Sequence, residues 1–483
     1  MRFTFIHCRA IDSTMAPLGI LYIATLLREK GHSVQTLDPW AHDNHFVDKL
    51  AKFKPDLIGL SFLTTQYRRA RDILARIRPL LPEARYLAGG IHSTALPEEV
   101  LRDLSLDFIV RGEGEETMAE VATGKDLKDI AGISYRKNEE IKQNPPRPPL
   151  ALLDSLPIPD RTLISYEKYL IPPGPFRGTY CRRAATIISS RGCPFNCIFC
   201  GSSKLMFGFK TRRRSVANVI AEIDYLYQRY QIDGLYFLDD TFTLSPAWVE
   251  EFCERFKTEN YKIKWGGQTR VNTVSFGLLK KMQEAGCCQI DYGVESGSDK
   301  VLKILKKGTS VEMIKRAFRL SHLAGLKPTA TFMIGNPGEK REDIEETLRV
   351  AKEIKPHHVK FFYLTPFPGT ELFAMARENK WLAPNLDYSA HWSIRQTELP
   401  LMEINFTRHE LSRLRASLQN KFIFKNYWHY LANLPFSGRL FMLILSHPRE
   451  FLHNLKKVLR SKRLDNLLEF SLALYRREKM SSG

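Results

Sequence analysis

The sequence predicts an α/β protein that begins with a doubly wound parallel sheet, continues as a barrel of strand–helix repeats and ends in a helical region. Three observations predict this order. Apolar strands alternate with amphipathic helices over the first 120 residues, a proline-dense stretch follows, and a second alternating series starts near residue 184. At 483 residues the chain exceeds what one hydrophobic core supports, so several domains are expected.

The first series gives the N-terminal domain. Strands are expected at 3–7, 33–38, 56–62, 85–90 and 107–116, with helices at 18–30, 43–52 and 68–81 between them. Such alternation implies right-handed crossovers and a parallel sheet. Ligands of this fold bind at the carboxyl ends of the strands, so the candidate loops are 8–18, 61–66, 89–93 and 111–116.

The proline-dense stretch contains "NPPRPPLALLDSLPIPDR" and "IPPGPFRG". Proline at this density cannot continue a helix or a sheet, so an extended connector wrapped between domains is expected. The expected domains are 1–140, a connector at 141–185, a barrel at 186–395 and a basic helical region at 396–483.

The second series repeats strand and helix six times. Its strands are expected at 184–190, 234–240, 263–271, 288–297, 327–335 and 358–369, with helices such as 215–230 and 310–325 between them. Six repeats indicate a partial or complete (β/α) barrel of the TIM type, in which the chemistry lies on the loops after the strands.

The loop after the first barrel strand reads "RGCPFNCIFCGSS" and carries Cys193, Cys197 and Cys200. Thiolates spaced four and three residues apart suit an iron–sulfur cluster, and three of them leave one iron of a four-iron cluster open. A zinc site completed by a distant histidine is the structural alternative. Cys253, Cys287 and Cys288 are expected to be buried small hydrophobes.

Composition excludes several classes. The chain is 43% hydrophobic and 26% charged, has no apolar run of about 18 residues and lacks a signal peptide, so a cytoplasmic protein is expected. The net charge of +19 permits nucleic-acid binding, but no recognition motif accompanies it. The basic amphipathic segment at 445–480 has three alternatives: packing on its own domain, contact with an acidic substrate, or peripheral contact with an anionic membrane.

The cysteine spacing, with an aromatic residue before the last cysteine, resembles the radical S-adenosylmethionine (SAM) enzymes. The resemblance implies that the three cysteines hold a [4Fe-4S] cluster, that the open iron chelates SAM, and that reductive cleavage yields a 5′-deoxyadenosyl radical. It also implies SAM contacts from Phe199, from "FLDDTF" (Asp239, Asp240), from "TRVN" (Arg270), from "GVESG" (Glu295, Ser296) and from "FMIGNPGE" (Gly335, Pro337).

The residues themselves leave alternatives at these outer positions. The paired aspartates could cap a helix or form a turn. A carboxylate on an apolar strand must be paired or used, so Glu295 needs a partner. Arg270 could be that partner or could clamp a cofactor carboxylate.

The N-terminal domain resembles the Rossmann-like cobalamin-binding module of one branch of that family. The resemblance implies cobalamin contacts from "SFLTT" (Ser61, Leu63), "AGGIH" (Gly89, Gly90) and "RGEGE" (Gly112, Glu113). The loop "CRAIDSTMAPLG" lacks the Asp-x-His-x-x-Gly element of mutases, so base-off cobalamin without a histidine ligand is expected. His92 is expected to form hydrogen bonds at the surface.

Together these resemblances imply a cobalamin-dependent radical SAM enzyme that methylates an unactivated carbon. A ring-forming activity, as in anaerobic magnesium-protoporphyrin monomethyl ester cyclases of similar layout, is the enzymatic alternative. Methylthiotransferases carry three cysteines in the N-terminal domain, whereas this one has only Cys8. A cobalamin sensor or carrier, or an RNA-binding protein, would not need an open iron. The expected partners are a small-molecule substrate such as a lipid, terpenoid or tetrapyrrole, and a flavodoxin or ferredoxin as reductant.

Overall fold

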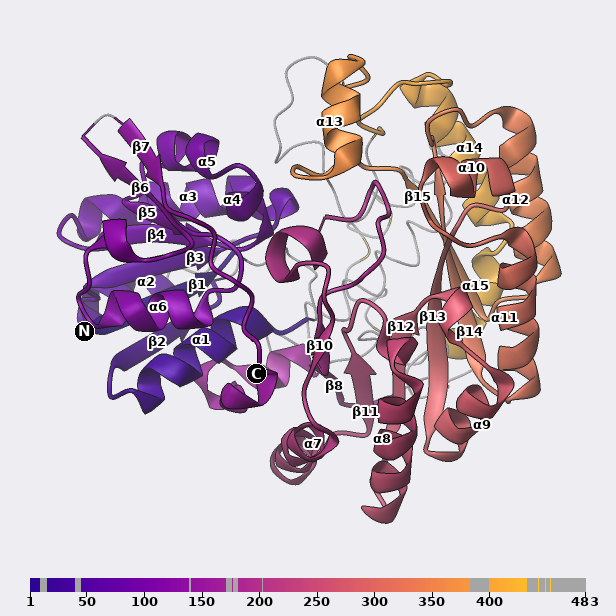
Figure 1. The fold of residues 1–483 in the computed structure, drawn as a ribbon, viewed down its shortest axis with the longest axis horizontal. Coiled ribbons are helices and arrows are strands. Elements are labelled where there is room, and N and C mark those ends of the chain that lie inside the picture. Colours follow the sequence, from indigo (N-terminus) through magenta and orange to yellow (C-terminus); the bar gives the residue numbers. More distant parts are fainter. Residues whose placement is uncertain are drawn as a thin grey trace.

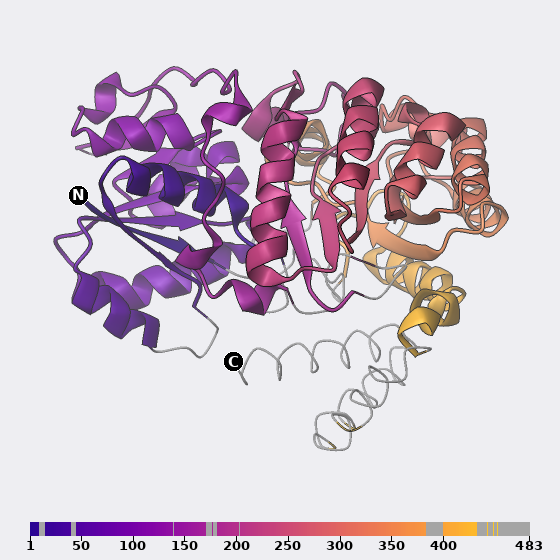
Figure 2. The ribbon, with the colours of Figure 1, turned by 90° about the horizontal axis from the view of Figure 1, so that it is seen from below.

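The computed structural model describes residues 1–8, 15–39, 45–138, 140–170, 176, 181–201, 203–382 and 399–431, with positions 442, 448 and 452. An N-terminal α/β domain lies beside an open barrel (Figure 1), and the view from below shows the same arrangement (Figure 2). The expected α/β fold, with a Rossmann-like domain followed by a partial barrel, is confirmed.

The N-terminal sheet has the strand order β2-β1-β3-β4-β5-β6-β7. Its first five strands are parallel, while β6 and β7 form an antiparallel hairpin that the sequence analysis missed. The strands are β1 Arg2–His7, β2 Ser33–Leu37, β3 Leu57–Ser61, β4 Arg85–Gly89, β5 Phe108–Val110, β6 Ile133–Lys137 and β7 Glu140–Gln143. The helices are α1 Leu18–Glu29, α2 His45–Phe53, α3 Tyr67–Ile77, α4 Ile91–Ala95, α5 Pro97–Asp103 and α6 Glu115–Ala122.

The barrel sheet has six parallel strands in the order β15-β14-β13-β12-β11-β8, so it stays open between β8 and β15. The strands are β8 Ala184–Ile187, β11 Gly234–Phe237, β12 Lys264–Thr269, β13 Cys287–Glu295, β14 Lys327–Ile334 and β15 His358–Tyr363. The helices are α7 Val216–Tyr230, α8 Pro246–Thr258, α9 Phe276–Glu284, α10 Asp299–Ile304, α11 Val311–Leu323, α12 Arg341–Glu353, α13 Glu371–Glu378, α14 Arg408–Asn420 and α15 Ile423–Leu431.

Short elements complete the chain. Two strands of two residues each, β9 Ser190–Arg191 and β10 Arg212–Arg213, pair antiparallel. A π-helical turn, η7, spans Ser203–Phe207. The 3₁₀ turns are η1 Thr64–Gln66, η2 Arg78–Leu80, η3 Leu127–Asp129, η4 Leu153–Ser155, η5 Arg161–Leu163, η6 Tyr166–Tyr169, η8 Phe242–Leu244 and η9 Val271–Thr273.

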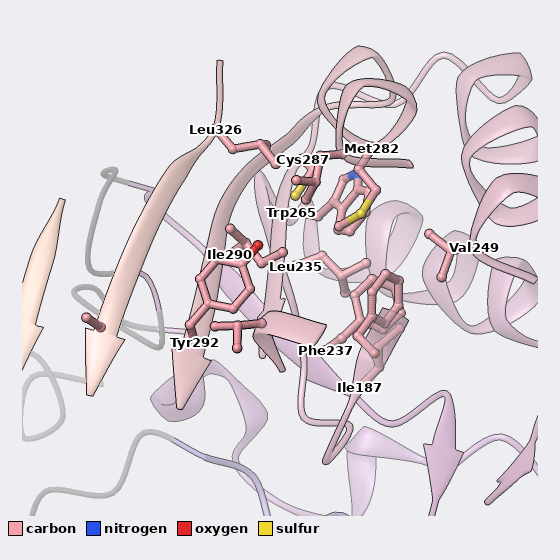
Figure 3. Close-up of a cluster of buried hydrophobic side chains, with 14 of the residues drawn as sticks. Ile187, Leu235, Phe237, Val249, Trp265, Met282, Cys287, Ile290, Tyr292 and Leu326 are labelled. Carbon is pink, nitrogen blue, oxygen red and sulfur yellow. The ribbon is translucent and has the colours of Figure 1, made fainter. Parts of the chain in front are cut away.

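Strand alternation decides which side chains form the barrel core. Leu235, Phe237, Ile290 and Tyr292 lie with Trp265 in one cluster of buried side chains (Figure 3). Trp265 is fully buried and donates a hydrogen bond from Nε1 to the Ala285 oxygen at 2.7 Å. Each such side chain contributes about 1.5–3 kcal/mol by leaving water, so this layer fixes the barrel.

The opposite face of the strands looks into the barrel. Asp291 on β13 accepts hydrogen bonds from Tyr236 on β11 and from Thr329 on β14. Gly266 on β12 lies between them, and a Cβ there would come within 2.8 Å of the Gln289 oxygen. A glycine at this position therefore lets side chains on β11 and β13 meet across the intervening strand.

The proline-dense stretch contacts both the N-terminal domain and the barrel. Asp160 pairs with Arg28 of α1, and its backbone nitrogen donates to Thr25 Oγ1 at 2.9 Å. The next residue, Arg161, is fully buried and pairs with Glu222 of α7.

The C-terminal helices cover β15, which is the edge strand of the barrel sheet. Asn426 of α15 accepts from the Val359 nitrogen at 2.8 Å and donates to the Val359 oxygen at 2.7 Å. Gln419 of α14 accepts from the Phe361 nitrogen at 3.1 Å. Side-chain amides thus take the hydrogen bonds that another strand would otherwise make.

Candidate active site

The three cysteines lie on a loop whose ends are paired by β9 and β10. Arg191 lies opposite Arg212 in this strand pair, so the loop that carries the cysteines begins and ends at the same place. Gly192 has a positive φ of 92°, and a Cβ there would lie 2.5 Å from the Lys210 oxygen. The loop therefore has a tight neck that requires glycine.

None of the three cysteines forms a disulfide with a described residue, and the loop is fixed at its centre. The nitrogen of Ile198 donates to the Leu305 oxygen at 3.2 Å, and the Ile198 oxygen accepts from the Leu372 nitrogen at 2.9 Å. Cys197 is buried and accepts from Arg270 Nη1 at 3.4 Å, while the Cys193 sulfur lies 3.8 Å from Thr241 Oγ1.

Free thiols beside a guanidinium fit the thiolate ligands of an iron–sulfur cluster. No group of three or more His, Cys, Asp or Glu side chains in the described part of the chain converges on a single metal ion. A four-iron cluster takes each thiolate at a different iron, so its ligands stand farther apart than those of one ion.

Two buried cations, Arg270 and Lys307, lie next to aromatic side chains of the loop. The Arg270 guanidinium lies 3.7 Å from the centre of the Phe195 ring and donates to the Lys307 oxygen. Lys307 lies 5.9 Å from the Phe199 ring and pairs with Glu295 at 2.8 Å, with both side chains at most 10% exposed. Lys307 was missed by the sequence analysis because nothing in "KILKKGTS" distinguishes it from its neighbour Lys306.

Glu295 ends β13 in a left-handed conformation with φ of 71°. A Cβ on Gly293 would lie 2.5 Å from the Glu295 Oε1 atom, so the side chain folds back over the strand. Such strain in a buried charged residue is typical of functional sites. The partner of Glu295 is Lys307, not Arg270 as the sequence allowed.

The neighbouring Ser296 faces the scaffold. It is fully buried, its Oγ lies 3.3 Å from Thr347 Oγ1 of α12, and it accepts from the Ser298 nitrogen at 3.2 Å. Its hydroxyl is therefore engaged in holding the β13–α10 turn.

Asp239 is also engaged in the scaffold. Its carboxylate accepts from the Ser189 nitrogen at 2.8 Å and from the hydroxyls of Ser189 and Ser190 at 2.5 Å each. It joins the ends of β11 and β8, so its oxygens have little capacity left for a ligand. Asp240 is partly exposed and precedes Thr241, which touches Cys193.

The loop after β14 folds around a buried carboxyl group. Glu339 accepts from the Gly335 nitrogen at 2.6 Å and from the Asn336 nitrogen at 3.1 Å. Burial raises the pKa of Glu339 to about 7. Gly335 has a φ of 84°, and Pro337, also buried, lies within the same turn.

The predicted cobalamin residues lie at the carboxyl ends of three adjacent strands. Ser61 and Leu63 follow β3, Gly89 and Gly90 follow β4, and Gly112 follows β5. Gly90 has a φ of 90°, and a Cβ there would lie 3.0 Å from the Phe62 oxygen.

The buried hydroxyls of Thr65 and Ser93, beside these strand ends, have no hydrogen-bond partner within the described residues. Leu63 is 46% exposed. Unpartnered hydroxyls, a turn made of glycines without side chains and an exposed apolar side chain fit a large, mostly apolar cofactor.

The Glu113 carboxylate forms ion pairs with Arg191 at 3.0 Å and Arg212 at 2.8 Å in the barrel domain. One prediction for this domain is wrong. His92 is not at the surface: it is 1% exposed, and its Nδ1 lies 3.1 Å from Thr64 Oγ1. Burial lowers the pKa of His92 to about 4. The loop at 9–14, where a histidine ligand is not expected, and most of 445–480 lie outside the described residues.

The two sets of loops are in contact. Thr94 Oγ1 on α4 donates to Met206 Sδ of η7, just after the cysteines, at 3.6 Å. The same hydroxyl accepts from the Gly112 nitrogen at 3.0 Å. A Cβ on Gly369, after β15, would lie 3.2 Å from Ala95 Cβ. The strand ends predicted to bind cofactors in the two domains therefore share one interface. This arrangement defines the class: an enzyme in which a Rossmann-like domain lies against a barrel whose first loop carries three cysteines.

Comparisons with known proteins agree. Residues 6–122 match the B12 binding domain, and residues 187–351 match the radical SAM superfamily. The chain is 35% identical to an uncharacterised methyltransferase of Pyrococcus horikoshii over 84% of this chain and 87% of that protein. It is 29% identical to the anaerobic magnesium-protoporphyrin IX monomethyl ester cyclase of Rubrivivax gelatinosus, covering 77% and 69% of the two chains.

Solved structures share the fold. The radical SAM methyltransferase TsrM of Kitasatospora setae, with cobalamin and a [4Fe-4S] cluster bound, has a TM-score of 0.72 at 18% identity, covering 86% of this chain and 90% of that one. The cobalamin-dependent radical SAM enzyme OxsB has a TM-score of 0.71 at 18% identity, covering 100% and 80%.

The chain belongs to the family of cobalamin-dependent radical SAM enzymes. Its cofactors are therefore a [4Fe-4S] cluster, SAM and cobalamin. Among the described residues, no helix is long and apolar enough to cross a membrane.

Proposed function

We propose that this protein methylates an unactivated carbon of a small-molecule substrate, with Cys193, Cys197 and Cys200 as the cluster ligands. The observation that carries the proposal is the shared interface: α4 and the loop after β5 lie against η7 of the cysteine loop. When bound, the cluster supplies the electron that cleaves SAM, and cobalamin supplies the methyl group.

The chain's own residues would orient these groups and exclude water. Arg270 donates a hydrogen bond to the Cys197 sulfur, and the pair Lys307–Glu295 presents one positive and one negative group beside Phe199. That pair matches the carboxylate and ammonium of an amino-acid moiety such as that of SAM. Asp240 and the Gly335–Pro337 turn complete the proposed SAM side, and the glycine turns complete the proposed cobalamin side.

Isotope-labelled SAM tests this function. Reduced, cobalamin-loaded enzyme given SAM with a trideuterated methyl group and a metabolite extract should form 5′-deoxyadenosine and S-adenosylhomocysteine and should give a product with the labelled methyl group. Deoxyadenosine without S-adenosylhomocysteine or a labelled product would contradict methyl transfer.

Ring formation is the second candidate because the relatives include the magnesium-protoporphyrin cyclase. A cyclase would produce deoxyadenosine and a product without added methyl mass, so the same assay separates the two. We propose a flavodoxin or ferredoxin as the reductant in either case, since SAM cleavage needs one electron.

We also propose peripheral contact with an anionic membrane through the C-terminal region. Phe424 and Trp428 stand one turn apart on α15 with exposed fractions of 81% and 69%, next to Lys421 and Lys425. Exposed aromatic residues among cations suit an anionic bilayer surface. Phe424→Ser/Trp428→Ser should reduce co-sedimentation with anionic vesicles; equal recovery with neutral vesicles would contradict the proposal.

A further inference from the structure

The neck of the cysteine loop carries two arginines side by side. Arg191 on β9 and Arg212 on β10 are directly opposite each other in an antiparallel pair, and both are at most 9% exposed. Like charges in this arrangement repel, and burial removes the water that would screen them. The neck therefore needs an anion to stay closed.

That anion comes from the other domain. Glu113 accepts from Arg191 through Oε1 at 3.0 Å and from Arg212 through Oε2 at 2.8 Å, so one carboxylate bridges both arginines. Glu115 accepts from the second amino group of Arg191 at 2.7 Å. Burial favours the neutral acid, but the hydrogen bonds and charges of Arg212 and Arg191 outweigh it and hold the pKa of Glu113 below its usual value.

The bridge is tied at both ends to cofactor loops. Glu113 follows Gly112, whose positive φ of 72° turns the chain after β5 and whose nitrogen donates to Thr94 of α4 at 3.0 Å. Arg191 precedes Cys193 by two residues. The connector joins the same point, because the Leu150 nitrogen donates to Glu113 at 2.7 Å and its oxygen accepts from Arg212 at 2.6 Å.

We propose that Glu113 of the cobalamin domain is a positioning residue of the cluster site: by bridging Arg191 and Arg212 it holds the neck of the cysteine loop closed and couples cobalamin binding to cluster binding. Because the Glu113 carboxylate contacts Arg191, Arg212 and the Leu150 nitrogen, this role does not depend on whether the reaction is methylation or ring formation. Coupling of this kind is reciprocal, so each cofactor strengthens the binding of the other.

The test compares three full-length variants. Glu113→Gln removes the charge but keeps the shape, and Arg191→Lys keeps the charge but cannot bridge Glu113 and Glu115 together. The control is Arg28→Gln, which breaks another pair between the N-terminal domain and the connector, that of Arg28 on α1 with Asp160. Circular dichroism and thermal unfolding establish that each variant folds.

The first readout is the rate at which an iron chelator removes the reconstituted cluster under anaerobic conditions. Glu113→Gln should lose iron about tenfold faster than the wild-type chain, because two buried arginines lose their common anion. Arg191→Lys should show a smaller increase, and Arg28→Gln should show none.

The second readout is the Kd of hydroxocobalamin, measured with the cluster present and in a chain with all three loop cysteines changed to alanine. In the otherwise wild-type chain, the Kd of hydroxocobalamin without the cluster should be about fivefold or more above the Kd with the cluster. In Glu113→Gln the ratio of these two Kd values should be about one.

Unchanged iron loss in Glu113→Gln, or an equal acceleration in Arg28→Gln, would overturn the proposal. So would a cobalamin ratio that survives the substitution. If Glu113→Gln does not fold, Arg191→Lys decides, and wild-type values for both readouts in that variant overturn the proposal.

Discussion

The barrel side of the shared interface and the cobalamin side carry different kinds of residues. Around the cysteine loop stand buried, paired charges: Arg270 at Cys197, and Lys307 with Glu295. At the cobalamin strand ends stand glycines and the exposed Leu63. A small zwitterionic ligand is recognised by charge, whereas a large corrin is recognised by shape, so the two sides should respond differently to substitution.

The largest effect is expected at the cysteines. Changing Cys193, Cys197 or Cys200 to alanine should abolish 5′-deoxyadenosine formation and the visible absorbance of the cluster, because each thiolate is proposed to hold its own iron. Cys253→Ala on α8 is the control, since that thiol lies in the hydrophobic core. Deoxyadenosine formation retained in any loop variant would remove that cysteine from the ligand set.

The second largest effect is expected on the barrel side of the interface, for Lys307→Met. This change leaves the carboxylate of Glu295 buried without its cation, so SAM binding should weaken by roughly tenfold to a hundredfold, measured by titration without turnover. Lys306→Met is the matched control, because Lys306 pairs with Glu371 at the surface. Surface pairs contribute about 0–1 kcal/mol, so the control should bind SAM normally.

The third effect is expected on the cobalamin side of the interface, for Gly90→Val, which places a side chain against the Phe62 oxygen. Cobalamin affinity should fall at least about tenfold while iron content stays unchanged. Gly124→Val is the control: Gly124 also has a positive φ, of 80°, but nothing lies within 4 Å of its Cβ position. Equal losses of cobalamin in both variants would show that backbone strain, not contact with the Phe62 oxygen, is responsible.

The smallest expected effect is on the pH dependence of stability, where Glu339 in the barrel and His92 in the N-terminal domain act in opposite directions. The pKa of Glu339 is raised to about 7, so its contribution to the free energy of unfolding is present at low pH and lost as the pH rises through 7. The pKa of His92 is lowered to about 4, so its contribution is present above about 6.5 and lost as the pH falls.

Each group changes stability by about 1 kcal/mol between pH 6 and 8, with opposite sign. Denaturant unfolding of Glu339→Gln should therefore show stability falling toward pH 6, and His92→Gln should show it rising. Parallel profiles in the two variants would contradict this assignment.

The sequence predicted what depends on local pattern. Strand alternation located the parallel strands of both sheets, and the loop spacing located Cys193, Cys197 and Cys200. The roles of Glu113 and Lys307 could not be predicted, because each is defined by a partner far along the chain: Glu113 pairs with Arg212, and Lys307 touches Phe199.

Asp239 and Ser296 show the converse limit. Both match motif positions, yet the structure uses their oxygens to join neighbouring elements. A motif fixes where a residue stands at a strand end, but the direction of its side chain depends on which hydrogen-bond donors the adjacent strand or helix offers.

The amide cover on β15 has a consequence for biosynthesis. Gln419 and Asn426 leave the ribosome after the strand whose edge they occupy. During that interval of translation the nascent barrel exposes an unpaired strand edge, which is a template for pairing with other chains. The edge of β15 is therefore covered only after α14 and α15 have been synthesised.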